Sequence, residues 1–118
     1  MKQSRLETAW ASVLDAIGHE RKRASDIAQL WSEHLLWGQS VDIATLLKTT
    51  LRSDSGPVLI SDVRIHLVCP HHLTIAFGTA DIAYEPNGKV ASFGALVDLI
   101  RACTARIVLQ ESATADIA

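Results

Sequence analysis

The sequence is poor in cysteine and carries no excess of positive charge. Its 118 residues include two cysteines, too few for the disulfide framework that stabilises small secreted domains. The 11 Lys and Arg residues against 13 Asp and Glu residues leave a formal net charge of −2, whereas phosphate-backbone binding draws on clustered cations. We therefore expect neither a disulfide scaffold nor a nucleic-acid partner.

Long apolar segments are missing as well. The longest stretch without a charged residue, 65–80, is shorter than a bilayer span and is interrupted by Pro70. The first residues, 1–7, contain no apolar run of the kind found in secretory leaders. These absences predict a cytoplasmic protein with no membrane partner, and the chain length predicts a single domain.

The first half of the chain has helical periodicity. Apolar residues recur three or four positions apart, which predicts three helices within residues 1–52. Gly18 and Gly38 are expected to end the first and second helices as left-handed caps, and Ser25 or Asp26 and Ser40 to begin the second and third. Two of the three tryptophans fall on the apolar faces, which favours core packing over a ligand-binding aromatic box.

The period changes from helical to twofold after residues 53–57, Ser-Asp-Ser-Gly-Pro, which predicts a linker between a helical segment, 1–52, and a core, 53–118. Alternating apolar residues predict strands over 60–69 and 73–84, and the short connection between them requires an antiparallel hairpin. Both patterns shift by one position, as at a β-bulge, for which Gly78 is a favourable place. A turn is expected at 85–88.

From Ser92 onward the spacing is helical again. Phe93, Leu96, Ile100 and Cys103 fall on one face, which predicts a helix packed on the sheet. Cys103 is interpreted as a buried apolar side chain rather than a reactive thiol. Residues 110–118 predict the start of a further helix, so the fold class is α+β.

Two short segments carry the residue types of a chemical site. Cys69-Pro70-His71-His72 offers thiol and imidazole groups, the ligands that tetrahedral zinc prefers. Gln110-Glu111 precedes a predicted helix, and a carboxylate can accept two neighbouring N–H donors, as in guanine recognition. Taken alone, each segment is also explained by solvation: two histidines facing water on a hairpin, and a polar helix start.

The order and spacing of these segments resemble GTP cyclohydrolase I, whose sequences carry Cys-Glu-His-His, a glycine, Ile-Ala-Tyr-x-Pro, a helix and Arg-x-Gln-Val-Gln-Glu. The corresponding segments here are Cys69-Pro70-His71-His72, Gly78, Ile82-Ala83-Tyr84-Glu85-Pro86, the helix from Ser92, and Arg106-Ile107-Val108-Leu109-Gln110-Glu111. The resemblance is strong from Ile60 to Ala118 and looser over the helical first half.

The resemblance implies the tunnelling fold (T-fold), an antiparallel sheet with two helices on one face, whose subunits join their sheets into a ring. This chain would supply N-terminal helices followed by the ββαα portion of that unit. The implied activity is that of an enzyme, a zinc hydrolase that opens the guanine ring of GTP at C8. It yields formate and dihydroneopterin triphosphate for pterin and tetrahydrofolate synthesis.

The resemblance also implies roles for individual residues. Cys69 and His72 would ligate Zn²⁺, which lowers the pKa of a bound water. His71 would be the acid/base that protonates N7 of the purine. Glu111 would hold the guanine edge with Gln110 beside it, and Arg106 would belong to the same wall of the pocket.

Several departures from the family pattern favour a second interpretation. Where the family has Ser-Lys-x-x-Arg for the triphosphate, this chain has Gly94, Ala95 and Asp98, with Arg101 one turn further on as a partial replacement. The third zinc ligand and two further strands of the family are also absent, which would leave an open sheet edge. The alternative is a noncatalytic oligomeric module that binds a guanine or pterin, its sheet completed by another chain or by a longer form of this one.

Overall fold

The computed structural model describes residues 3–46, 49–51, 56–86 and 89–118. Within them the helices and strands are, in chain order, α1 (Gln3–Ile17), α2 (Ala24–Leu30), β1 (Thr49–Leu51), β2 (Val58–Val68), β3 (Ile75–Tyr84), β4 (Lys89–Ala91), α3 (Phe93–Thr104) and α4 (Gln110–Ile117). Part of the expected 53–57 linker and the Asn87-Gly88 turn lie outside the described residues. The order confirms the α+β class and, apart from the three-residue β4, the ββαα arrangement from β2 to α4.

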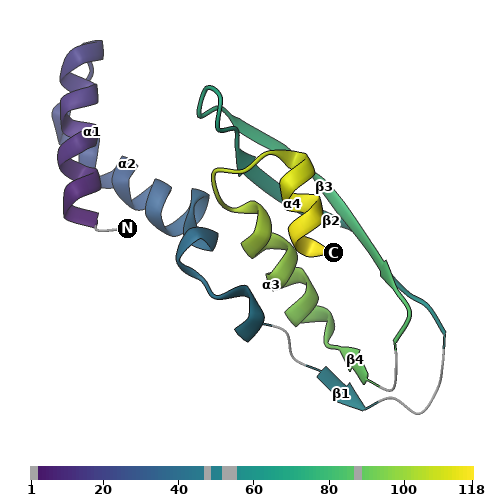
Figure 1. Ribbon diagram of the computed structural model, residues 1–118. Coiled ribbons are helices and arrows are strands. Elements are labelled where there is room, and N and C mark those ends of the chain that lie inside the picture. The colour runs from purple at the N-terminus through teal and green to yellow at the C-terminus, as the bar shows by residue number, and fades with distance from the viewer. Residues whose placement is uncertain (1–2, 47–48, 52–55, 87–88) are drawn as a thin grey trace.

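The molecule is elongated, with principal extents of 60 × 23 × 18 Å. Figure 1 shows α1 and α2 at one end, apart from the β2–β3 hairpin, with α3 and α4 lying together along one face of that hairpin. The short β1–β4 pair, which the sequence analysis did not predict, lies at the opposite end from α1. None of the described helices is long and apolar enough to cross a membrane.

The N-terminal helices pack through small and aromatic side chains. Ala11 and Leu14 of α1 are buried against Ala24 of α2. The rings of Trp10 and Trp31 lie 5.6 Å apart at an angle of 37°, which confirms the prediction that these tryptophans pack internally. Gly18 ends α1 with φ +78°, as predicted for a left-handed cap.

The predicted caps of the second and third helices are wrong. A helical turn over Arg21–Arg23 leads directly into α2, so the backbone enters the helix without a side-chain cap from Ser25 or Asp26. The third helix is, within the described residues, a single 3₁₀ turn over Ile43–Thr45. Its cap is Asp42, whose Oδ1 accepts a hydrogen bond from the Ala44 N–H.

Gly38 does not end a helix in a left-handed conformation but permits a close backbone approach. It lies in the turn Trp37–Ser40, where its N–H donates to the carbonyl oxygen of Ala105 at 2.9 Å. A Cβ atom on Gly38 would overlap the carbonyl oxygen of Ala102. Only glycine fits here, because the turn packs directly on the backbone at the end of α3.

The hairpin pairs β2 and β3 antiparallel, as predicted, but the bulge is not at Gly78. Gly78 pairs in regular register with Ile65, whereas the register shifts between Ile60 and Val63. Asp62 there has φ +59°, and its N–H donates to Asp81 Oδ1 at 2.8 Å. The bulge therefore occupies a site where an aspartate tolerates the left-handed region and a second aspartate satisfies the freed donor.

The shift of period in β3 has a different origin from the bulge. Phe77 belongs to the apolar alternation that predicts this strand, yet the residue is 81% exposed. In the observed register it pairs with His66, so β3 keeps its alternation without an extra residue. The main core forms on the other face, where Ile60 and Val63 of β2 contact Leu96 and Ile100 of α3.

Candidate functional site

The Cys69–His72 segment forms the tight turn between β2 and β3. The Cys69 N–H donates to Thr74 O at 2.9 Å, and the Leu73 N–H donates to Cys69 O at 2.8 Å. Cys69 is half-buried, whereas His71 and His72 are exposed. These main-chain bonds close the turn, and among the described residues its thiol and imidazole groups make no hydrogen bond.

The second predicted segment begins α4. Leu109 is extended, with φ −74° and ψ 148°, and Gln110 and Glu111 form the first helical turn. Both side chains are exposed. A carboxylate in this position is favoured by the unpaired N–H groups and the positive end of the helix dipole.

A backbone bridge brings these two segments together. Val68 donates its N–H to Arg106 O at 3.1 Å and accepts from the Val108 N–H at 3.1 Å, so Val68 and Ile107 form a parallel bridge. Because the two segments run parallel there, the turn that follows Val68 and the helix that follows Val108 leave from the same end of the hairpin. Segments about forty residues apart are thus joined at one end of the hairpin, and Figure 1 shows α4 beginning toward that end.

Arg106 is engaged with backbone carbonyls rather than left free in the site. Its Nε donates to Ala102 O at 3.0 Å and its Nη2 donates to Gly38 O at 2.7 Å. These bonds tie the end of α3 to the turn at Gly38. The role of Arg106 in the wall of a binding pocket stays a prediction.

The described residues do not form a complete zinc site. No group of three or more His, Cys, Asp or Glu side chains among them is arranged to hold a metal ion. Cys69 and His72 fit zinc in donor type, since they supply sulfur and nitrogen from one turn. A zinc site with three protein ligands therefore needs a donor from beyond this set.

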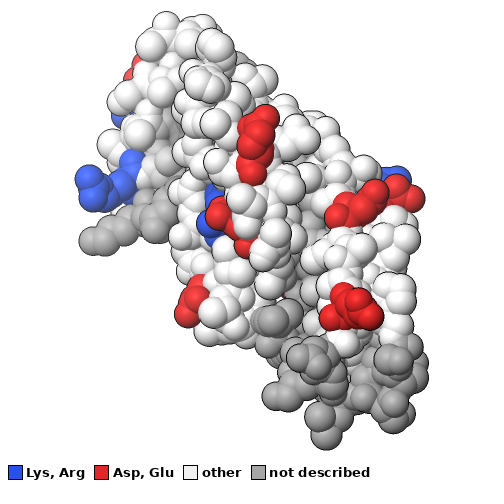
Figure 2. Space-filling model, turned by 45° about the vertical axis from the view of Figure 1, so that its right-hand side comes forward, with Lys and Arg blue, Asp and Glu red and all other residues white. Residues whose placement is uncertain are grey.

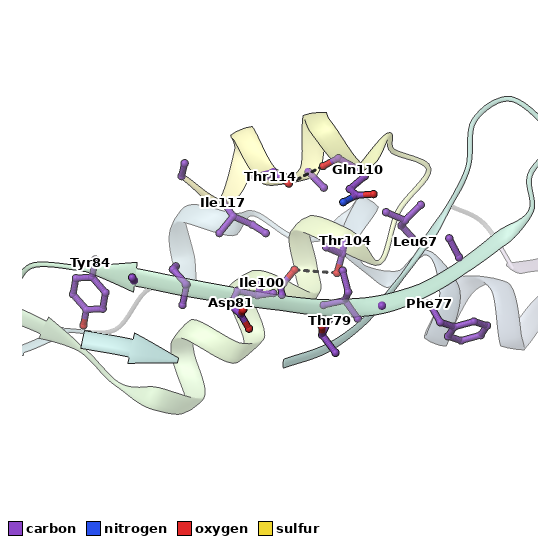
Figure 3. Close-up of a pocket in the computed structure, with 18 residues that line it drawn as sticks. Leu67, Phe77, Thr79, Asp81, Tyr84, Ile100, Thr104, Gln110, Thr114 and Ile117 are labelled. Carbon is purple, nitrogen blue, oxygen red and sulfur yellow. Dashed lines mark hydrogen bonds between the residues drawn. The ribbon is translucent and has the colours of Figure 1, made fainter. Parts of the chain in front are cut away.

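A cavity of about 710 Å³, which neither periodicity nor motif spacing predicts, lies between β3 and α4. Figure 3 shows Gln110 and Thr114 of α4 on one side and Thr79 and Asp81 of β3 on the other. The sequence feature that indicates this cavity is a set of small residues at alternate positions of β3, namely Ala76, Gly78 and Ala80. Small side chains leave space under the helix, and Gln110 contributes an amide to it.

The start of α3 carries no cation in its first turn. Ser92 caps it by accepting from the Ala95 N–H at 3.3 Å, and Gly94 and Asp98 are exposed. Arg101, one turn beyond Asp98, donates from its Nε to the carbonyl oxygen of Arg64 at 3.3 Å. Figure 2 shows the charged side chains of one face in small separate groups, with no broad basic patch among the residues drawn in colour.

The two cysteines lie in different environments. Cys103 is fully buried in α3, and this burial raises the pKa of its thiol, although the nearby Arg106 acts in the opposite direction. The folded chain therefore holds this proton more tightly than the unfolded chain. Cys103 therefore contributes to the free energy of unfolding fully below the ordinary thiol pKa, and this contribution is lost as the pH rises through the raised pKa of the folded state.

We expect one fast and one slow thiol in the folded protein. Cys69 should react with an aromatic disulfide reagent within minutes at pH 8, and Cys103 only as the chain unfolds, at least about a hundredfold more slowly. Absorbance of the released thiolate measures both phases. The variant Cys69→Ser should lack the fast phase, and rapid labelling of two thiols in wild type would contradict this assignment.

Comparison with known proteins gives a consistent result over nearly the whole chain. The sequence model of the family described as GTP cyclohydrolase I matches residues 6–118. The protein named GTP cyclohydrolase 1 from Ralstonia nicotianae is 35% identical over 121 residues, covering 97% of this chain and 58% of that protein. The one from Chromobacterium violaceum is 33% identical, covering 96% and 58%, and the one from Hyperthermus butylicus is 30% identical, covering 98% and 61%. The chain thus spans about three fifths of the length of these curated relatives.

Proposed function

This chain belongs to the GTP cyclohydrolase I family, and from that premise we propose that the protein opens the guanine ring of GTP at C8. The products are formate and dihydroneopterin triphosphate, within pterin and tetrahydrofolate synthesis. The observation that carries the proposal is the Val68–Ile107 bridge, because it sets the Cys69–His72 turn beside the Gln110-Glu111 helix start. Since the relatives are longer, the activity is proposed for the whole protein.

Glu111 is proposed to hold the guanine edge. Two oxygens of one carboxylate accept hydrogen bonds from two neighbouring N–H groups, and guanine presents such a pair at N1 and the 2-amino group. Glu111 is exposed in the first turn of α4, where the helix favours its ionised form. Gln110, one residue earlier, is proposed to contact the base from the cavity under α4.

His71 is proposed to move the proton at N7 of the purine. Its imidazole is exposed on the turn, next to the proposed metal ligand His72. Imidazole groups gain and lose protons near neutral pH, which suits an acid that protonates a ring nitrogen while a ring bond breaks. The main-chain bonds of the turn leave this side chain free for that task.

Cys69 and His72 are proposed to hold zinc. When bound, zinc supplies an activated water for attack on C8. The remaining protein ligand is proposed to come from a part of the protein outside the described residues, because these form no group of three donors.

A second function, binding of a guanine or pterin without turnover, is favoured by the start of α3. There Gly94, Ala95 and Asp98 stand where the family pattern has Ser-Lys-x-x-Arg. A carboxylate near a triphosphate repels it, and no cation in the first turn of α3 offsets that repulsion. This module would keep Gln110 and Glu111 and lack efficient chemistry on GTP.

We also propose that the outer edge of β3 pairs with another strand. Among the described residues β3 pairs only with β2, which leaves the N–H and C=O groups of its other edge without a strand partner. Exposed strand edges recruit further strands. The partner would be the remainder of the protein or a neighbouring subunit in a ring oligomer.

Incubation of the protein with GTP and Zn²⁺, followed by oxidation, tests these functions. We expect fluorescent neopterin from wild type, and loss of product by roughly a hundredfold or more in Glu111→Ala, which removes two charge-assisted hydrogen bonds. The matched control Ser112→Ala changes the next exposed residue of α4 and should retain activity.

Calorimetry with GTP and with a pterin separates the two functions. Binding that depends on Glu111 without any product identifies the noncatalytic module. Folded wild-type protein that shows neither product nor binding would contradict both proposals.

A further inference from the structure

A second cavity, of about 340 Å³, lies where three elements meet. Glu33 and His34 of the turn Trp31–Leu35, the centre of β2 and the last turns of α3 form its walls, with Trp37 beside them. It shares Ile65 and Thr104 with the first cavity, and none of the predicted site residues lines it. Its volume falls in the range of small-molecule sites.

Two guanidinium groups from different elements line this cavity. Arg64 belongs to β2 and Arg101 to α3, and the bond from Arg101 Nε to Arg64 O holds the second guanidinium against the strand edge. The ion pairs found in the described part of the chain involve Arg21, Lys22 and Arg23, so neither cavity arginine has a carboxylate of those described residues within 4.0 Å. Two arginines thus line the cavity, and neither is paired with a carboxylate of the described residues.

One carboxylate, Glu33, also lines the cavity. Its Oε2 accepts a hydrogen bond from Gln29 Nε2 at 3.1 Å, along its own helix. With both histidines neutral, the lining carries two positive charges and one negative charge. The balance is positive, whereas the chain as a whole carries a formal charge of −2.

The imidazole of His66 is fixed at the cavity wall. Its Nε2 lies 3.2 Å from Leu35 O, which requires that this nitrogen carry the hydrogen. The carbonyl oxygen of Leu35 can accept this bond because it lies at the end of a π-helical turn, Trp31–Leu35, which the Leu36 N–H closes by donating to Trp31 O at 2.9 Å. Single π-helical turns are frequent at functional sites. His34, on the same turn, adds a second imidazole to the lining.

Trp37 gives the cavity an aromatic wall. Its side chain is half-buried and stands next to the turn at Gly38, whose position is fixed by the bond from Arg106 Nη2 to Gly38 O. An indole beside two guanidinium groups suits a ligand with an anionic end and a planar or apolar end.

We propose that this cavity binds a phosphate group, either free or as a monoester whose organic part lies against Trp37. Guanidinium groups match the oxygen geometry of phosphate and form paired hydrogen bonds with it. Arg64 and Arg101 approach from different elements and so address different oxygens, with the imidazole of His34 as a further donor. The arginines and imidazole proposed to hold phosphate are separate from the residues proposed to hold guanine, although the two cavities share Ile65 and Thr104.

Calorimetric titration at constant ionic strength, with inorganic phosphate and with phenyl phosphate, tests the proposal. Wild type should show saturable binding, and Arg64→Gln and Arg101→Gln should each weaken it at least tenfold. Arg23→Gln is the matched control: it removes the same charge from an exposed arginine outside the cavity and should bind as wild type does. Arg64→Gln retains the carbonyl that Arg101 contacts, so it does not disturb that backbone bond.

Tighter binding of phenyl phosphate than of phosphate, lost in Trp37→Leu, identifies a monoester; equal binding of the two identifies free phosphate. Absence of saturable binding, or equal weakening in Arg23→Gln, would overturn the proposal. Cys69→Ser and Glu111→Ala should leave phosphate binding unchanged, so the result of this test does not depend on the result of the GTP assays.

Discussion

Cys69→Ser is expected to reduce the zinc bound to the purified protein from about one ion per chain to roughly a tenth or less. Zinc binds a thiolate strongly, and a serine hydroxyl keeps its proton at neutral pH. The substitution leaves His72 as the remaining proposed donor on the turn. Elemental analysis after removal of free metal measures the ratio of zinc to protein.

The fold should survive this change, because the backbone of Cys69 holds the turn. Its N–H bonds to Thr74 O and its carbonyl accepts from Leu73, and neither bond involves the thiol. Cys103→Ala is the matched control, since this buried thiol lies in the α3 core and should not affect zinc. Equal zinc in wild type and Cys69→Ser, or negligible zinc in both, would remove the metal site from this turn.

Gly38→Ala is expected to destabilise the protein by about 3 to 5 kcal/mol, among the largest effects of a single methyl group. The added Cβ would overlap Ala102 O and lie 2.9 Å from Ala105 O, and both oxygens belong to backbone at the end of α3. Relief requires the turn to move away. That movement would break the bonds from Gly38 N to Ala105 O and from Arg106 Nη2 to Gly38 O.

Urea unfolding followed by circular dichroism measures this effect, and Gly94→Ala is its control. Gly94 lies in the first turn of α3 with no atom within 4 Å of its added Cβ. Alanine there should leave stability unchanged or raise it by up to about 1 kcal/mol, since it favours the helix. A Gly38→Ala protein as stable as wild type would show that the turn does not pack on α3 as described.

The sequence predicted the elements that carry local periodicity. The helix from Phe93, the hairpin and the helix from Gln110 all form, because apolar spacing at 3.6 or 2 residues is set by which face must be buried. The prediction failed where the third helix was expected. There Asp42 caps a single 3₁₀ turn, and Thr49–Leu51 pairs with β4 instead, a long-range pairing that periodicity does not encode.

The β-bulge also shows which features local periodicity predicts and which depend on contacts between distant residues. The change of parity between Ile60 and Val63 correctly indicated an irregular strand, yet Gly78 was the wrong place for it. The choice depended on Asp81, a residue of the opposite strand that accepts the free N–H of Asp62. A cross-strand partner is invisible until the register is known.

For the candidate site, the sequence by itself determined which chemical groups are present: a thiol and two imidazoles on one turn, and an amide and a carboxylate at one helix start. The resemblance to the GTP cyclohydrolase I family and the order of the motifs along the chain also follow from the sequence alone. Only the tertiary structure decided that the two segments are neighbours, because the Val68–Ile107 bridge depends on how α3 packs across the hairpin. It also decided that Gly38 is a contact point and that Arg64 and Arg101 share a cavity. Such juxtapositions arise from long-range backbone packing, which periodicity and spacing along the chain do not specify.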